Sequence, residues 1–151
     1  MRIVRFTPGP DAGLGQDPLF GVLEDDATIS IISGDPIYSG IQKTAAKIEL
    51  NKVRLLAPII PRSKVVCVGK NYADHAAEMG GVVPDEPIIF LKPNTSVIGP
   101  NDTIVWPDMS ERIDHEAELA IVIGRICKDV PKVRVNDVIF GYTIANDVTA
   151  R

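Results

Sequence analysis

Glycine and proline interrupt this sequence so often that long regular elements have little room to form. The 151 residues include 12 glycines and 12 prolines, and the apolar runs between them are short. Short apolar runs bounded by Gly, Pro, Asn and Asp are typical of β-strands, and helical periodicity is sparse along this chain. The sequence therefore predicts a mainly β fold with a few short helices.

The first third of the chain is expected to be mostly strand. Residues 2–6 alternate polar and apolar side chains and predict one strand. Two further apolar runs, 19–24 and 28–32, predict a hairpin around the acidic turn 25–27. Residues 44–50 are expected to add a helical turn or two.

Proline also indicates where one domain ends and the next begins. Pro58 and Pro61 bias the residues before them toward extended backbone, as in a crossing between two units. We therefore expect a small N-terminal β-rich domain, residues 1–57, followed by a larger β-rich domain, residues 58–151. The larger domain is expected to contain short helices ending at Met79 and at about residue 138, and the strands 64–68, 88–91, 103–105, 115–123 and 141–146.

The composition excludes several classes of partner. A net charge of −4 with scattered Lys and Arg residues provides no basic stripe for a nucleic acid. No uncharged apolar stretch is long enough to cross a bilayer, so we expect no membrane partner and a cytoplasmic location. Cys67 and Cys127 lack the Cys-x-x-Cys spacing of zinc or redox sites and lie in apolar runs, which predicts two buried, reduced thiols.

The segment 114–124 (DHEAELAIVIG) carries the most informative charges. Its alternation predicts a strand on which Glu116 and Glu118 share one face. The two residues are then roughly 6.6 Å apart along the strand, and their charges repel by roughly 2.5 kcal/mol at an effective dielectric constant of about 20. If this face is solvated, water screens the repulsion, and the alternation is the ordinary polar face of a half-exposed strand.

A second acidic strand end favours a metal site instead. The apolar run 141–146 ends at the carboxylate of Asp147, which can supply a third oxygen ligand. Carboxylates without clustered His or Cys are hard ligands, suited to Mg²⁺, Mn²⁺ or Ca²⁺. Three carboxylates leave coordination positions open for a bidentate substrate such as a 2-oxo carboxylate, whose developing negative charge the ion would stabilise.

A candidate general base lies in the segment 68–80. A loop there leads into a short helix, on which His75 and Glu78 are three residues apart and therefore share a face. The Glu78 carboxylate can orient the imidazole and raise its basicity, as a general base near neutral pH requires. The spacing alone also fits a surface helix with an exposed His and Glu, and does not decide between the two.

Four segments share one resemblance: 68–75 (VGKNYADH), 87–93 (PIIFLKP), 114–119 (DHEAEL) and 141–151 (GYTIANDVTAR). Together they resemble the fumarylacetoacetate hydrolase family. They occur in the family's order along the chain, whereas the residues before Leu55 resemble only its variable N-terminal domain. The resemblance implies the family's mixed β-roll catalytic domain, of which this chain carries the N-terminal portion.

The resemblance implies roles for five residues. Glu116, Glu118 and Asp147 would be the ligands of Mg²⁺ or Mn²⁺. His75, paired with Glu78, would activate water or take a proton from the substrate. The helix that carries these two residues is similar to a lid that orders over bound substrate.

The resemblance implies less about the roles of other positions. Lys92 resembles a substrate-binding position near the site, whereas Asp114 and His115 receive no role. The sequence stops at Arg151, inside a motif that the family continues. We therefore expect the chain to be one portion of a longer protein and inactive alone, with the remainder supplying further catalytic residues and pairing the open sheet edges.

The expected function is that of a divalent-metal-dependent enzyme acting on 2-oxo or 2-hydroxy-unsaturated dicarboxylic acids. The short N-terminal region resembles family members of bacterial aromatic catabolism, which favours an isomerase or decarboxylase similar to 2-hydroxyhepta-2,4-diene-1,7-dioate isomerase. Hydrolysis of a carbon–carbon bond in acylpyruvates or fumarylacetoacetate and decarboxylation of oxaloacetate remain open. A metal-stabilised binding or assembly module without turnover also remains open. The resemblance further suggests a homodimer.

Overall fold

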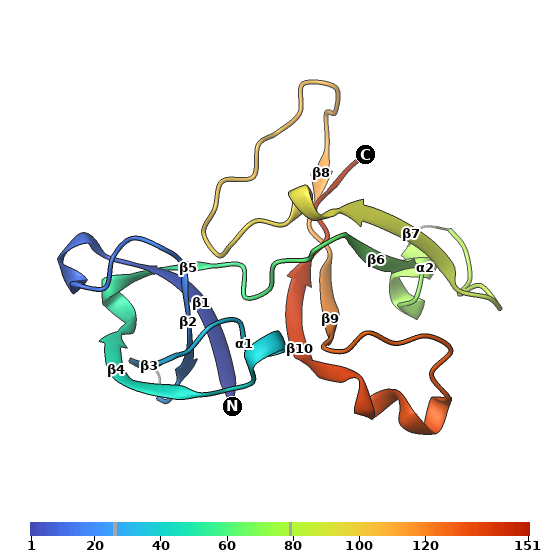
Figure 1. Cartoon of the computed structure of the whole chain (residues 1–151). Coiled ribbons are helices and arrows are strands. Elements are labelled where there is room, and N and C mark those ends of the chain that lie inside the picture. Colours follow the sequence, from blue (N-terminus) through green and yellow to red (C-terminus); the bar gives the residue numbers. More distant parts are fainter. Residues whose placement is uncertain (26, 79) are drawn as a thin grey trace. The chain divides into compact units, whose positions relative to one another are not determined.

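The structure, a computed structural model, describes residues 1–25, 27–78 and 80–151 and consists mainly of strands (Figure 1). Its α-helices are α1 (Pro36–Ser39) and α2 (Ala73–Glu78), and brief 3-10 turns occur elsewhere. The predicted mainly β fold with short helices is confirmed. Within the described ranges, no helix combines the length and the apolar character that crossing a bilayer requires.

A five-stranded sheet forms in the N-terminal part of the chain. Its members are β1 (Arg2–Pro8), β2 (Leu19–Leu23), β3 (Thr28–Ile32), β4 (Lys43–Glu49) and β5 (Val53–Leu56). Their order across the sheet is β4-β3-β2-β1-β5. β1 pairs antiparallel with both β2 and β5, so the expected first strand lies inside the sheet, next to one strand of the expected hairpin.

The core of this sheet is built from apolar side chains of β1, β3 and β4. Phe6 and Ile29 are fully buried, and they pack with Ile31 and Ile48. Fully burying one such side chain stabilises a fold by about 1.5–3 kcal/mol. The four side chains therefore stabilise the sheet by several kcal/mol in total, before the entropy of ordering them is subtracted.

The expected helical turn at 44–50 is wrong, because this segment forms the edge strand β4. Its side chains alternate, with Ile48 7% exposed and the flanking Lys47 and Glu49 facing solvent. Pairing with β3 and burial of Ile48 in the core outweigh the modest helix propensity of the alanine and lysine residues.

The turn between β2 and β3 is closed by Asp25, as its place in the expected hairpin suggests. Its Oδ1 accepts hydrogen bonds from the N–H groups of Ala27 (2.9 Å) and Thr28 (2.7 Å). These backbone hydrogen bonds, that of Ala27 first, hold the pKa of Asp25 below its usual value. Asp26, the other acidic residue of this predicted turn, lies outside the described residues.

The rest of the chain forms three antiparallel two-stranded ribbons. Strands appear close to the expected positions, except that residues 103–105 are exposed and pair with no strand of the described chain. The expected helix near 131–138 is a 3-10 turn, Lys132–Asp137. The ribbons pair β6 (Lys64–Gly69) with β7 (Ile88–Pro93), β9 (Ala117–Ile123) with β10 (Ile139–Asn146), and β8 (Ile113–Asp114) with β11 (Thr149–Ala150).

The two cysteines differ in exposure. Cys67 lies on β6 and is partly buried, whereas Cys127 is exposed, and neither forms a disulfide. The expectation of two buried thiols is therefore wrong for Cys127. β9 ends at Ile123, so the apolar run around Cys127 continues into an exposed loop, in which Ile126 is fully accessible to solvent.

The close packing of β2 against β3 predicts that Gly21 tolerates no side chain. A Cβ at this position would overlap Cγ2 of Ile29 and lie 2.9 Å from the carbonyl oxygen of Ser30. We expect Gly21→Ala to lower the free energy of unfolding by about 1–3 kcal/mol through overpacking, as measured by urea denaturation. Gly141→Ala is the matched control, since nothing lies within 4 Å of a Cβ there. Equal losses in both variants would contradict this packing.

Candidate metal centre

The three acidic residues expected to bind a metal meet at one end of the β9–β10 ribbon. Glu118 of β9 pairs with Ala145 of β10. Glu116 immediately precedes β9 and Asp147 immediately follows β10, and the N–H of Asp147 donates to the carbonyl oxygen of Glu116 (2.8 Å). Because paired residues and residues two apart share a face, this register places all three carboxylates on the same side of the ribbon.

Further hydrogen bonds hold the backbone at this end of the ribbon. The N–H of Glu116 donates to Oδ1 of Asn146 (3.0 Å), so a side-chain amide continues the pairing where β9 begins. Thr149 Oγ1 donates to the carbonyl oxygen of Asp147 (3.1 Å). Asp147 itself is only 8% exposed. The positions of Glu116 and Asp147 are therefore fixed by local hydrogen bonds as well as by the strand ladder.

Glu116, Glu118 and Asp147, here called the acidic cluster, each place one carboxylate oxygen within 4.8 Å of the other two. At that separation each pair of charges repels by about 3.5 kcal/mol at an effective dielectric constant of about 20, before further screening by solvent. Two oxygen ligands of one Mg²⁺ lie at most about 4.2 Å apart. Small side-chain rotations would therefore let the cluster share one ion.

The chemistry of these donors fits a hard cation. In the described part of the chain, the cluster offers only carboxylate oxygens, without a histidine or cysteine among its members. Such a donor set suits Mg²⁺, Mn²⁺ or Ca²⁺, whereas zinc sites are built mainly from cysteine and histidine. The acidic cluster is thus a candidate site for a divalent metal.

Arg151 and Asp114 adjoin the acidic cluster. The guanidinium of Arg151 donates from Nη2 to Oε1 of Glu116 (2.5 Å) and from Nε to Oδ2 of Asp114 (2.8 Å). Arg112 donates to both oxygens of Asp114 (2.8 and 2.9 Å). No sequence motif predicts this contact. Residues 114 and 151 come together because β8 pairs with β11, with Thr149 opposite Asp114.

Among the charged side chains just described, negative charges outnumber positive ones. When ionised, the acidic cluster and Asp114 carry four negative charges, and Arg112 and Arg151 carry two positive ones. These six side chains together carry a formal charge of −2, which is opposite in sign to that of a divalent cation.

The chain forms two compact units, the first from residues 1–31 with 45–102 and the second from residues 32–44 with 103–151. The other residues expected at the site belong to the first unit. The backbone of His75 and Glu78 lies in α2, as expected, but their side chains lie outside the described part of the structure. Lys92 lies on β7 opposite Val65 and is partly buried. The roles of these three residues stay predictions.

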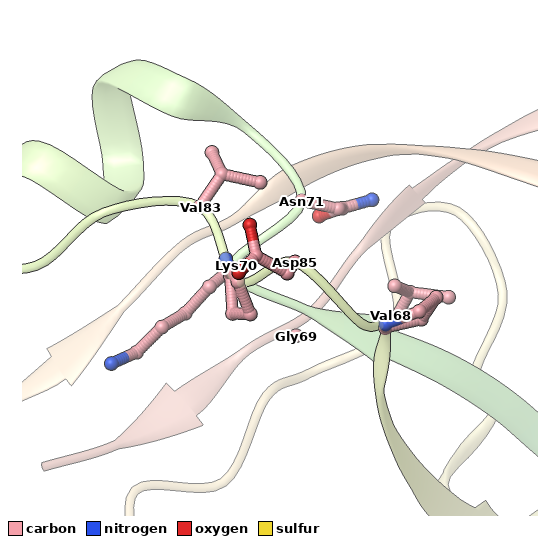
Figure 2. A pocket seen from close by; sticks show the side chains of 8 residues that line it. Val68, Gly69, Lys70, Asn71, Val83 and Asp85 are labelled. Atoms are coloured by element: carbon pink, nitrogen blue, oxygen red, sulfur yellow. The ribbon is translucent and has the colours of Figure 1, made fainter.

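A pocket of about 170 Å³ lies within the unit that carries α2 (Figure 2). Lys70, on its wall, has a left-handed backbone conformation with φ of 52°, which few residues other than glycine adopt. This turn leads the chain from β6 toward α2, and Lys70 Nζ lies within 3.7 Å of the Cβ position of Gly81, just beyond the helix. The pocket is lined by Val68, Gly69, Lys70, Asn71, Val83, Pro84, Asp85 and Pro87.

The ion pairs of Asp114 predict its behaviour on acidification. Hydrogen bonds from Arg112 and then from Arg151 lower the pKa of Asp114 from 3.8 to about 2. Because the folded-state pKa lies below the unfolded value, the ion pairs stabilise the fold fully above about pH 4 and are lost as the pH falls through 2. We expect the Asp114 carboxyl to be ionised at pH 3 in an NMR titration, and protonation near pH 3.8 would contradict the ion pairs.

Two parts of the sequence each match a known protein family. Residues 64–151 match the family described as fumarylacetoacetate (FAA) hydrolase C-terminal, and residues 1–58 match the family described as Rv2993c-like, N-terminal. The acidic cluster lies within the first of these matches. The domain boundary after residue 57 stays a prediction.

Two curated relatives show how much of a longer sequence the chain represents. Protein Rv2993c of Mycobacterium tuberculosis is 65% identical over 118 residues, which are 78% of this chain and 42% of that protein. The mitochondrial oxaloacetate tautomerase fahd2 of Xenopus laevis is 46% identical over an alignment that covers all of this chain and 53% of that protein. The chain thus spans about half the length of these relatives.

Solved structures agree with these matches. The 2-hydroxyhepta-2,4-diene-1,7-dioate isomerase from Mycobacterium marinum has a TM-score of 0.82 at 43% identity, over 100% of this chain and 55% of that one. The maleylpyruvate hydrolase from Sphingobium sp. SYK-6, solved with manganese(II) and pyruvate, has a TM-score of 0.71 at 28% identity, over 100% of this chain and 60% of that one. With more than half of its residues matching the family and its fold shared with these enzymes, this chain belongs to the fumarylacetoacetate hydrolase family.

Proposed function

We propose that the protein is a divalent-metal-dependent enzyme that isomerises or decarboxylates 2-oxo or 2-hydroxy-unsaturated dicarboxylic acids. The observation that carries the proposal is the approach of the Glu116, Glu118 and Asp147 carboxylates to within 4.8 Å of one another. The names of two relatives, an oxaloacetate tautomerase and a heptadienedioate isomerase, support the isomerase branch. Both names describe the conversion of a dicarboxylic acid into an isomer of itself.

The acidic cluster would hold Mg²⁺ or Mn²⁺, and the manganese in the maleylpyruvate hydrolase supports this choice. A bound ion would supply Lewis acidity toward the negative charge that develops on the 2-oxo oxygen. The three carboxylates are fewer than the six oxygen ligands that such ions commonly take, at about 2.0–2.1 Å for Mg²⁺. Positions therefore remain for the substrate's carboxylate and 2-oxo oxygens.

His75 is assigned the proton transfer, with Glu78 orienting its imidazole. In isomerisation the imidazole takes a proton from a carbon next to the conjugated 2-oxo system and returns it to another carbon of that system. In decarboxylation no proton is taken from carbon; CO₂ leaves, and the imidazole, protonated beforehand from water, donates a proton to the carbon that lost the CO₂. A general base of this kind accounts for about 10²–10⁴-fold in rate. Lys92 is assigned a contact to a substrate carboxylate, which its cationic ammonium suits.

Hydrolysis of a carbon–carbon bond is the second candidate, favoured by the likeness to the maleylpyruvate hydrolase. In that reaction His75 would activate a water molecule that attacks a ketone carbon, and the proton would go to the carbon that leaves. Decarboxylation of oxaloacetate belongs with the first candidate.

A homodimer and a cytoplasmic location are part of the proposal, and so is a contribution to activity from residues beyond the described chain.

Substrate class can be established with the full-length protein. Oxaloacetate, acylpyruvates and unsaturated 2-oxo diacids should be tested with and without Mn²⁺, with products identified by NMR. A rearranged diacid of unchanged mass supports isomerisation, release of CO₂ supports decarboxylation, and two carbon fragments support hydrolysis. Absence of turnover on every compound, with the metal bound, would leave the binding or assembly module as the function.

The metal assignment predicts a specific loss on replacing Glu118. We expect Glu118→Gln to weaken Mn²⁺ binding at least about 10-fold in isothermal titration calorimetry, because one charged ligand becomes neutral. Glu49→Gln is the matched control, since Glu49 lies on β4 with a side chain 56% exposed and an ion pair to Lys52. Equal Mn²⁺ affinity in the Glu118→Gln variant and the unsubstituted protein would remove Glu118 from the metal site.

The assignment of proton transfer to His75 predicts a loss of turnover without a loss of metal affinity. His75→Ala should reduce kcat by about 10²-fold or more and leave the affinity for Mn²⁺ nearly unchanged, because His75 moves a proton and binds no metal. His115→Ala is the matched control, since His115 is exposed and has no assigned role. Steady-state kinetics on the substrate identified above measures both variants, and unchanged kcat in His75→Ala would exclude His75 from the mechanism.

A further inference from the structure

We infer that Asp114 is a positioning residue for the metal centre and that it acts on Glu116 through Arg151. This inference rests on the proposed metal site, and it adds to that site two residues that do not contact the ion. It stands on the chain of ion pairs Arg112–Asp114–Arg151–Glu116, in which opposite charges alternate.

Arg151 is held at both ends, so its guanidinium has a defined place. Its backbone N–H donates to the carbonyl oxygen of Arg112 (2.9 Å), and its carbonyl oxygen accepts from Oγ of Ser110 (2.9 Å). Ser110 is 8% exposed, and the carbonyl oxygen of Arg112 also lies 2.7 Å from its Oγ, so the two carbonyl oxygens share one hydroxyl hydrogen. The side chain of Arg151 is 28% exposed, compared with 72% for Arg112. Arg151 is therefore held in place at the site, whereas Arg112 is the exposed end of this chain of ion pairs.

The guanidinium of Arg151 is shared between two carboxylates. Its Nε faces Asp114 while Nη2 faces Oε1 of Glu116. Separate nitrogens can make these two contacts because the guanidinium is a planar fork with five donors. The ion pair with Asp114 thus restrains the guanidinium in the position from which it contacts Oε1 of Glu116.

Loss of the Asp114 charge would have two consequences. The guanidinium would interact with Glu116 alone and compete with the metal for that carboxylate. The orientation of Glu116 would also lose a restraint, because one of the two ion pairs that hold Arg151 would be absent. Partners of metal ligands that act in this way typically change metal affinity by about 10–100-fold.

The test measures the dissociation constant of Mn²⁺ alone, by isothermal titration calorimetry on the full-length protein. Asp114→Asn keeps the shape of the side chain and removes its charge, and we expect about 10-fold weaker binding or more. Asp114→Glu should recover part of this loss. Asp137→Asn is the matched control with expected unchanged affinity, since Asp137 forms an exposed ion pair with Arg134 in the turn Lys132–Asp137.

A double-variant cycle separates action through Arg151 from a general effect of charge. In an Arg151→Gln background, Asp114→Asn should change the Mn²⁺ affinity less than about 2-fold, because the connection to Glu116 is already absent. An equal effect of Asp114→Asn in both backgrounds would overturn the inference, as would an unchanged affinity in the single variant.

Two further results complete the test. If Asp114→Asn does not fold, as judged by circular dichroism, Arg151→Lys serves instead. Lysine has a single nitrogen in place of the separate Nε and Nη2 that contact the two carboxylates, so weaker Mn²⁺ binding is again expected. Unsubstituted affinity in Arg151→Lys overturns the inference. Failure of the unsubstituted protein to bind Mn²⁺ would overturn the proposed metal site together with this inference. Mn²⁺ binding with an affinity that is the same after substitution of Asp114 or Arg151 would overturn this inference alone.

Discussion

Repulsion among three carboxylates is the constraint to which the rest of the candidate site responds. Backbone pairing of β9 with β10 holds Glu116, Glu118 and Asp147 on one face, with oxygens within 4.8 Å of one another. Like charges at this distance are unfavourable unless cations accompany them. Arg151 supplies one positive charge by its ion pair with Glu116. The proposed divalent cation would oppose the negative charge of these carboxylates.

The geometry of the site comes from backbone register more than from side-chain packing. The buried core lies in the N-terminal sheet around Phe6 and Ile29, whereas the β9–β10 ribbon exposes large apolar residues such as Leu119 and Ile144. What fixes the acidic cluster is a set of hydrogen bonds at the ribbon's end, including that from the Glu116 N–H to Asn146. Because a shift of one residue would turn every side chain to the other face, register determines the site.

Local patterns predicted the features that depend on local geometry. Alternation along a strand was enough to place Glu116 and Glu118 on one face, and the apolar run before Asp147 identified its strand end. The contact between Asp114 and Arg151 was missed because it depends on which distant strands pair. Non-local pairing also explains why residues 44–50 form the edge strand β4 instead of a helix, and why residues 103–105, without a strand partner in the described chain, remain irregular.

X-ray diffraction from crystals of the full-length protein grown with Mn²⁺ would examine the shared ion directly, because manganese scatters anomalously. An anomalous peak is expected among the carboxylates of Glu116, Glu118 and Asp147, within about 2.0–2.3 Å of an oxygen of each, close to the distances found for similar ions. A peak elsewhere in the molecule, or side chains that diverge at saturating Mn²⁺ without a peak between them, would contradict the proposed metal centre.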